Sequence, residues 1–175
     1  MKRSLKAVTL SVLSILVAAP MFLSAEKASA QPTGTSANYI GGGIAAGVTN
    51  GGQTGDAATF GGNIQGRYVI PNTPVSARGA ILFSDETSAI MPIVSYDLPV
   101  TNNTNIYLGG GYSFVEQNGR PSPLGNKNSV VLTTGVETQV ARNIVLYSDA
   151  KLGIRAYENS PASAVSFQAG AAYRF

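Results

Sequence analysis

The sequence predicts an all-β protein with eight strands, and three features support this prediction. Apolar and polar side chains alternate over segments of about 9–13 residues, which is the period of a strand with two different faces. Turn-forming residues separate these segments, and no stretch after residue 30 shows convincing helical periodicity. The expected strands are residues 37–48, 58–70, 75–83, 89–98, 105–115, 129–140, 144–157 and 164–175.

The first four segments each divide into an apolar face and a polar or glycine face. Segment 37–48 sets isoleucines against glycines, and segment 58–70 sets Ile64 and Tyr68 against Gln65 and Arg67. In segment 75–83, Phe83 and Arg78 fall on opposite faces. In segment 89–98, Tyr96 and its neighbour Asp97 do the same.

The last four segments repeat this division. Leu108 opposes Gly109 in segment 105–115, and Val136 opposes Glu137 in segment 129–140. Segment 144–157 places its leucines opposite its charged residues. Segment 164–175 alternates to its last residue, with apolar and aromatic side chains on one face: Phe167, Ala169, Ala171, Tyr173 and Phe175.

The first thirty residues have the pattern of a secretory signal peptide. A basic start (Lys2, Arg3, Lys6) precedes an apolar run, which ends in Ala28-Ser29-Ala30. The run is short for a membrane-spanning helix and contains Pro20, so we expect cleavage after Ala30. The predicted organisation is therefore a cleaved signal peptide, residues 1–30, and one β-barrel domain, residues 31–175.

Composition excludes several classes of function. Four of the 12 basic residues and one of the nine acidic residues lie in the predicted signal peptide, which leaves eight of each in the mature chain. A neutral chain lacks the basic patch that nucleic-acid binding needs. The absence of Cys and His argues against the usual zinc sites, cysteine nucleophiles and Ser–His triads, so we expect no enzyme, cofactor or metal.

Two barrel types fit the alternation, because the apolar face can point inward in a soluble barrel or outward in a membrane barrel. Aromatic residues of the apolar faces gather toward the two strand ends, as interfacial aromatic girdles do. Segment lengths suit a tilted crossing of a bilayer, and short turns alternate with longer loops. These features favour an eight-stranded antiparallel up-and-down transmembrane β-barrel. A soluble periplasmic or secreted ligand-binding barrel is the alternative, and a barrel enzyme is disfavoured by the lack of His.

Residues 37–175 resemble the small eight-stranded outer-membrane β-barrel proteins of the OmpA-transmembrane and OmpX kind. The most specific part is the last strand, with Tyr173 and the terminal Phe175. The resemblance implies an integral outer-membrane protein with a structural or minor pore role. It also implies contact with outer-membrane lipid and lipopolysaccharide, no nucleic acid and a monomeric state. By the same resemblance, Tyr173 and Phe175 would be recognised by the barrel-assembly machinery as well as lying in an aromatic girdle.

A barrel of eight strands has an interior just wide enough for side chains to fill. Charged residues on the polar faces are expected to form a paired network there: Arg67, Arg78, Asp97, Glu137, Asp149, Lys151, Arg155 and Arg174. Pairing is expected because an unpaired buried charge is strongly destabilising. Such a network either plugs the barrel or gates a narrow ion path.

The loops carry weaker candidate sites. Asp56, Asp85 and Glu86 offer carboxylates to a divalent cation, although solvated loop carboxylates are the simpler interpretation. Arg120 and Lys127 offer charges to the phosphates of lipopolysaccharide. Asp97 and Asp149 could form a hydrolytic pair only if a substrate could enter the predicted lumen.

Overall fold

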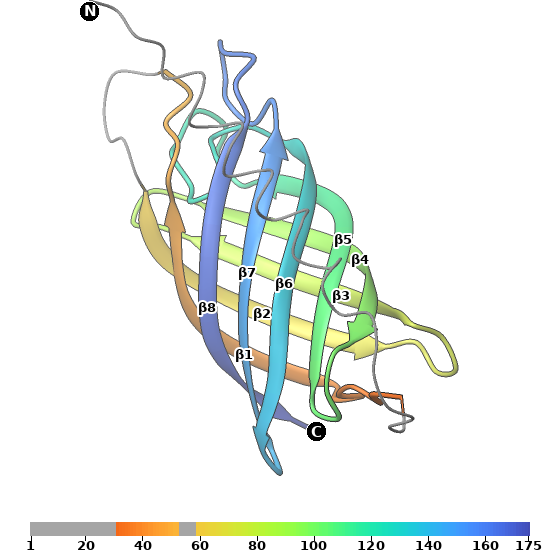
Figure 1. The fold of residues 1–175 in the computed structure, drawn as a ribbon. Coiled ribbons are helices and arrows are strands. Elements are labelled where there is room, and N and C mark those ends of the chain that lie inside the picture. Colours follow the sequence, from red (N-terminus) through yellow and green to blue (C-terminus); the bar gives the residue numbers. More distant parts are fainter. Residues whose placement is uncertain (1–30, 53–58) are drawn as a thin grey trace, which may run out of the picture. The chain divides into compact units, whose positions relative to one another are not determined.

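The protein folds into a closed antiparallel barrel of eight strands, each hydrogen-bonded to the next in the chain (Figure 1). The computed structural model describes residues 31–52 and 59–175. The predicted signal peptide and Asp56 therefore lie outside the described residues. The strands are β1 (Tyr39–Gly47), β2 (Phe60–Val69), β3 (Val75–Phe83), β4 (Ser88–Pro99), β5 (Thr104–Val115), β6 (Ser129–Ala141), β7 (Ile144–Ile154) and β8 (Ala164–Arg174).

These strands confirm the predicted fold class, and their bounds differ from the expected ones mainly in β7. That strand was expected to reach residue 157 but ends at Ile154. Arg155 has a φ of 53°, a left-handed conformation that takes the chain out of the ladder. In the described part of the chain, no helix is long and apolar enough to cross a membrane.

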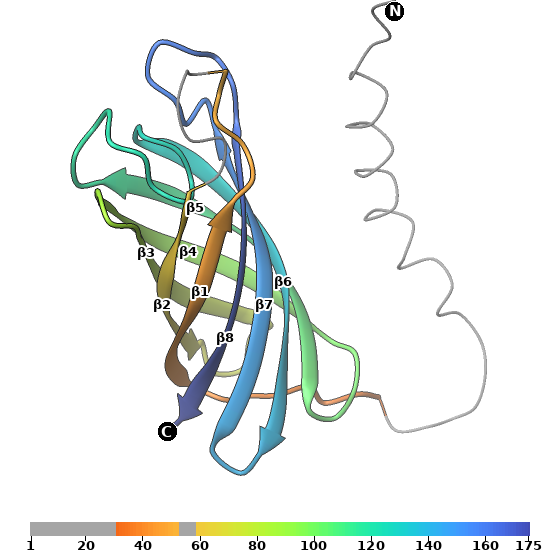
Figure 2. The ribbon, with the colours of Figure 1, turned by 90° about the vertical axis from the view of Figure 1, so that its left-hand side faces the viewer.

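The two ends of the barrel differ in their connections. The short turns 70–74, 100–103 and 142–143 lie at one end together with the carboxyl terminus, and we call this the turn end (Figure 2). The longer connections lie at the opposite loop end, and they include residues 116–128 and 155–163. This arrangement follows directly from eight strands that run alternately up and down.

Pairing between β1 and β8 closes the barrel without an open edge. Tyr39 lies opposite Arg174, and the ladder continues to Gly47 opposite Ser166. Just beyond the ladder, the backbone N–H of Phe175 donates to the carbonyl oxygen of Asn38 at 3.1 Å. Closure stabilises the protein in a membrane, because each unpaired backbone N–H or C=O group in hydrocarbon costs several kcal/mol. The last strand thus pairs almost to its final residue.

The apolar faces of the strands point outward and the charged side chains point inward. Leu108 and Phe60 are 63% and 67% exposed, whereas Glu137 is fully buried and Lys151 is 2% exposed. A soluble barrel would have the reverse arrangement. The structure therefore does not favour the soluble ligand-binding alternative, and it supports the outward-facing apolar belt of a membrane barrel.

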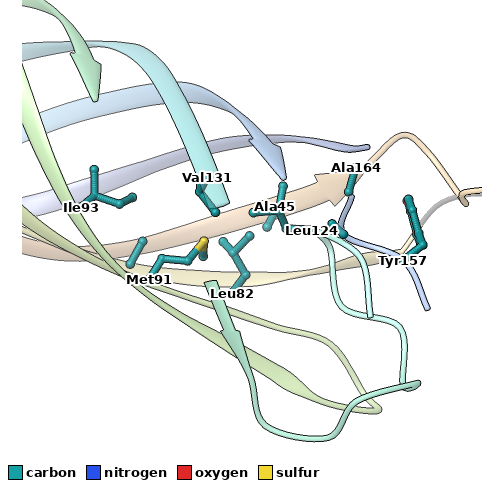
Figure 3. Close-up of a cluster of buried hydrophobic side chains, with 10 residues drawn as sticks. Ala45, Leu82, Met91, Ile93, Leu124, Val131, Tyr157 and Ala164 are labelled. Atoms are coloured by element: carbon teal, nitrogen blue, oxygen red, sulfur yellow. The ribbon is translucent and has the colours of Figure 1, made fainter. Parts of the chain in front are cut away.

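The loop-end half of the lumen contains an apolar cluster, beside buried polar side chains such as Asn63 and Ser166. Buried side chains from several strands and from the loops pack together there, including Ala45, Leu82, Met91 and Val131 (Figure 3). Met91 and Leu82 are diagonal neighbours on β4 and β3, and Leu124 of the 116–128 loop belongs to the same cluster (Figure 3). The sequence pattern predicted only the charges of the lumen, so this apolar cluster is a finding of the structure.

Two inward-facing glycines leave room for tyrosine rings from the adjacent strands, since Gly135 lies opposite Tyr107 and Gly170 lies opposite Tyr147. A Cβ atom on Gly135 would lie 2.6 Å from Cζ of Tyr107, and one on Gly170 would lie 2.5 Å from Cζ of Tyr147. No side chain fits at such distances without displacing the ring. The glycines therefore accommodate the rings of Tyr107 and Tyr147 inside the lumen.

Candidate functional site

Four charged side chains form a closed ring of ion pairs in the turn-end half of the lumen, and we call them the ionic quartet: Arg67, Arg78, Asp97 and Glu137. Arg67 lies 2.7 Å from an oxygen of each carboxylate. Arg78 lies 2.9 Å from Asp97 and 3.0 Å from Glu137. All four residues are buried, and their formal charges cancel.

The register of the barrel explains why these residues meet. Arg67 on β2 lies directly opposite Arg78 on β3, a placement that is unfavourable for two like charges on their own. Asp97 on β4 and Glu137 on β6 supply two carboxylates, and each guanidinium uses two nitrogens to reach both of them. The planar guanidinium of Arg holds several N–H donors in a fixed geometry that can bind two carboxylates at once, whereas the ammonium of Lys is a single point charge.

Neutral side chains complete the hydrogen bonding of the ionic quartet. The Arg67 Nε donates to Ser76 at 3.0 Å, and the Arg78 Nε donates to Ser95 at 2.7 Å; both serine hydroxyls donate in turn to Asp97. Glu137 accepts from the Tyr39 hydroxyl at 2.9 Å and from the Asn105 amide at 3.0 Å. The ionic quartet therefore has the supporting hydrogen bonds that a buried ion cluster needs.

A second cluster lies above the ionic quartet, toward the loop end. Lys151 Nζ lies 2.5 Å from Asp149, and it also donates to the amide oxygens of Gln65 and Gln168. Tyr107 donates to Asp149 at 2.8 Å, and its ring centroid lies 3.6 Å from the guanidinium carbon of Arg78. That cation–π contact joins the two clusters through one aromatic ring.

The turn end of the lumen is covered by the segment before β1, residues 33–38, which we call the strap. Thr35 is buried, and its backbone N–H donates to Asn105 at 3.2 Å. Its carbonyl oxygen accepts from Arg67 at 3.1 Å and from the Asn105 amide at 2.8 Å. The Gly34 N–H donates to Thr101 in the β4–β5 turn. The strap is thus anchored to the ionic quartet and to the far wall.

The loop end is covered by residues 121–126 of the β5–β6 connection, which we call the lid. Leu124 is fully buried at its centre, and Ser122 stabilises the lid by accepting from the Leu124 N–H at 3.2 Å. Gly125 has a φ of 96°, a left-handed conformation that favours glycine. The Asn126 N–H donates to the Ala156 carbonyl at 2.9 Å, which ties the lid to the neighbouring loop.

Tyr157 supports the same end of the barrel from the β7–β8 connection. Its hydroxyl contacts the Thr49 hydroxyl at 2.8 Å and donates to the Thr49 carbonyl oxygen. Burial raises the pKa of the Tyr157 phenol, while the hydrogen bond to Thr49 acts in the opposite direction. The phenol therefore remains a protonated donor at neutral pH.

The structure places the predicted lumen residues in three groups. Six of them form the ionic quartet and the Asp149–Lys151 pair. Arg174 is half-buried at the turn end, where it donates to Gln139 at 2.7 Å rather than to a carboxylate. Arg155, predicted to face the lumen, is instead exposed, because its left-handed conformation ends the alternation of β7.

The last two aromatic residues lie on the outer surface at the turn end. Tyr173 is 57% exposed and its hydroxyl accepts from the Asn143 amide at 2.9 Å, while Phe175 is 71% exposed. Both are available for contact with lipid or another protein.

The loop candidates do not form a built site. Glu86 pairs with Arg120 at 3.2 Å in an exposed ion pair, and Lys127 is exposed. Within residues 31–52 and 59–175, no group of three or more His, Asp or Glu side chains could hold a metal ion. Asp97 and Asp149 belong to different clusters inside the lumen, so they do not form a hydrolytic pair.

Several residues that shape the lumen were missed by the sequence analysis. Tyr39 and Tyr147 stack with ring centroids 6.2 Å apart, and Tyr107 joins the two ionic clusters. On each strand these tyrosines alternate with outward-facing apolar residues. That alternation could have identified them as lumen residues. Leu124 and Thr35 lie outside the strands, where alternation gives no information.

Comparison with known proteins supports the fold. No family model matches the chain, and no curated protein matches it by sequence. Among solved structures, the chain is similar to Ail, the attachment invasion locus protein of Yersinia pestis, with a TM-score of 0.52 and 18% identity over 80% of this chain and 99% of that chain.

Two further solved structures show the same likeness. Neisserial surface protein A matches with a TM-score of 0.55 and 17% identity, over 79% of this chain and 97% of that chain. The outer membrane protein OprG of Pseudomonas aeruginosa matches with a TM-score of 0.55 and 10% identity, over 84% and 99%. The resemblance to small eight-stranded outer-membrane barrels is therefore confirmed at the level of the fold.

Proposed function

We propose that the protein is a non-enzymatic, integral outer-membrane barrel with a structural role, exported by its signal peptide and monomeric in the membrane. The observation that carries this proposal is that apolar side chains face outward while charged side chains face the lumen. A belt of exposed Ile, Leu, Val and aromatic residues surrounds a lumen in which charges are enclosed. Such a belt is stable against acyl chains and unfavourable in water.

The filling of the lumen favours a structural role over a pore. The ionic quartet is neutral and fully paired, the strap covers one end, and the lid covers the other. An ion that entered would have to displace Leu124, then the apolar cluster, then two arginines that are each bound twice. The lumen is therefore better suited to rigidify the barrel than to conduct.

The partners we propose follow from the outer surface. Outer-membrane lipid would contact the apolar belt, and exposed Arg120 and Lys127 would meet lipopolysaccharide phosphates at the loop end. The barrel-assembly machinery would recognise Tyr173 and Phe175, which are exposed at the turn end, during insertion.

Site-directed spin labelling tests which face meets lipid. A label at Leu108 is expected to be accessible to oxygen and shielded from an aqueous quencher, because Leu108 points outward from the middle of β5. A label at the next residue, Gly109, points inward and serves as the matched control. The reverse pattern, with Gly109 accessible to lipid, would contradict the membrane assignment.

Single-channel recording tests the sealed lumen separately. Protein reconstituted in planar bilayers is expected to show no stepwise conductance, because both ends are covered and the charges are paired. The Glu137→Ala variant is expected to be equally silent if it folds, since the strap and lid remain. Regular openings in the wild type that change in this variant would show that the ionic quartet gates a pore.

A further inference from the structure

A groove of about 470 Å³ lies on the outer surface of the barrel, within the apolar belt and over four neighbouring strands, β3 to β6. We call it the belt groove. Its outward-facing lining residues are Val75, Val94, Tyr96, Leu108, Gly110 and Leu132. Ser95 and Gly109 are lumen-facing positions, so they contribute their backbone to its floor. The belt groove therefore belongs to the outer wall and is separate from the filled lumen.

Strand register explains the shape of the belt groove. Its outward-facing residues form two rows of neighbours across adjacent strands: Val75, Tyr96 and Leu108 in one row, and Val94, Gly110 and Leu132 in the other. The row with Tyr96 lies nearer the turn end, where β4 ends and β5 begins. In the other row, a glycine stands between two larger side chains. The missing side chain of Gly110 therefore opens the wall, and the groove continues from it toward the turn end.

Internal packing does not require glycine at position 110. A Cβ atom on Gly110 would lie 3.8 Å from its two nearest atoms, Leu132 Cδ2 and the Val131 carbonyl oxygen, which is ordinary van der Waals contact. By contrast, a Cβ atom on Gly111 would overlap the carbonyl oxygen of Pro92. Glycine inside a strand weakens the strand and often marks a place where a ligand or another backbone approaches closely. The open space at Gly110 thus fits an occupant from outside the chain.

The chemistry of the lining indicates a hydrocarbon occupant. The outward-facing side chains of the groove are aliphatic except for Tyr96, and they are continuous with the belt that faces acyl chains. In hydrocarbon no hydrophobic effect drives association, so van der Waals packing decides what binds. A flexible acyl chain can follow a narrow apolar groove. A second copy of this protein would instead present the convex outside of a closed barrel, which cannot enter it.

Tyr96 indicates how such a chain would be oriented. It is 51% exposed and lies opposite Val75, the first residue of β3 at the turn end. Tyrosines of membrane barrels place the ring in hydrocarbon and the hydroxyl at headgroup level. We propose that the belt groove binds one acyl chain of a glycerophospholipid, with the ester region beside Tyr96; this inference rests on the outer-membrane assignment above. Short turns of such barrels face the periplasm, so the lipid belongs to the periplasmic leaflet.

Photolabelling of the mature barrel in vesicles tests this site. The probe is a phosphatidylethanolamine with a photoactivatable diazirine in the middle of one acyl chain, in vesicles of phosphatidylethanolamine and phosphatidylglycerol. Mass spectrometry then locates the adducts. Labelling of Leu108 and Leu132 is expected to exceed that of Ile64, an outward-facing residue in the middle of β2, by about three- to tenfold, the preference that about five to ten extra van der Waals contacts give. Equal labelling of these residues would overturn the proposal and leave ordinary boundary lipid.

A matched pair of glycine substitutions provides a second measurement. Gly110→Leu fills the groove and is expected to lower the labelling of Leu108 to the level of Ile64. Gly66→Leu places the same side chain at an outward-facing glycine of β2, where a Cβ atom would lie 3.6 Å from its nearest atom, and is expected to leave the labelling of Leu108 unchanged. Circular dichroism and heat-dependent gel mobility establish that both variants are folded, and the wild-type pattern does not depend on them.

Other occupants would give different results. Disulfide-linked dimers of a Leu108→Cys variant in the same vesicles would show a second copy over the groove and would overturn the proposal. Labelling confined to lumen-facing positions such as Gly109 would contradict the membrane orientation itself. Even labelling around the whole belt would leave that orientation intact and overturn the groove alone.

Discussion

Glu137→Gln is expected to destabilise the barrel by about 3–5 kcal/mol, the range for breaking a buried ion pair from one side. Glu137 is fully buried and pairs with Arg67 at 2.7 Å and Arg78 at 3.0 Å. Glutamine keeps the size of the side chain and removes the charge, so two guanidinium groups would share Asp97 alone. Urea unfolding from lipid vesicles, followed by circular dichroism and by heat-dependent gel mobility, measures the change in unfolding free energy.

A matched control separates this effect from the loss of any carboxylate. Glu116 is exposed and accepts a hydrogen bond from Ser88, so Glu116→Gln is expected to change the unfolding free energy by less than about 0.5 kcal/mol. Adding Arg78→Gln to Glu137→Gln balances the buried charge again and is expected to recover part of the loss. Equal stability of Glu137→Gln and Glu116→Gln would show that the ionic quartet does not hold the barrel together.

Leu108→Arg is expected to destabilise the protein in a bilayer by about 2–4 kcal/mol, as charged residues do near the membrane midplane of β-barrels. Leu108 points outward from the middle of β5 and is 63% exposed. The same substitution on a soluble protein would change little, because an exposed arginine is well hydrated. Unfolding of the variant and of the wild type from the same vesicles measures the difference.

The control for the Leu108→Arg prediction is an outward-facing residue near the end of the barrel, away from the membrane midplane. Val48 is 51% exposed but follows β1 at the loop end of the barrel. Val48→Arg is therefore expected to cost only about 0–1 kcal/mol, the range near the interface. If both arginines cost the same small amount, the apolar belt is not in contact with hydrocarbon.

Alternation of side chains made most of this fold predictable. In each strand, the period of two assigns every residue to one face, and the inward placement of Arg67, Arg78 and Glu137 follows from it. The predicted bounds of β3 agree with the structure. The choice between an inward and an outward apolar face needed the aromatic girdles as well, because period alone is the same in both barrels.

Features outside the strands could not be predicted in this way. Leu124 reaches the lumen from a loop, and Thr35 reaches it from the chain before β1. The prediction that Arg155 faces the lumen was wrong, because its left-handed φ angle ends the alternation of β7. The sequence could not predict which charges pair within the ionic quartet. The pairs form only if the stagger of β2, β3, β4 and β6 brings the four side chains to the same height in the lumen.

The pairing of β1 with β8 has a consequence for the order of folding. Tyr39 and Arg174 are separated by nearly the whole described barrel in sequence, so their ladder is the contact with the largest loop-closure entropy. Hairpins between neighbouring strands can form early and locally, while the circle is completed last. A chain in which β8 has not yet paired with β1 therefore exposes both edges of a seven-stranded ribbon, and these edges can pair with other molecules until the barrel closes.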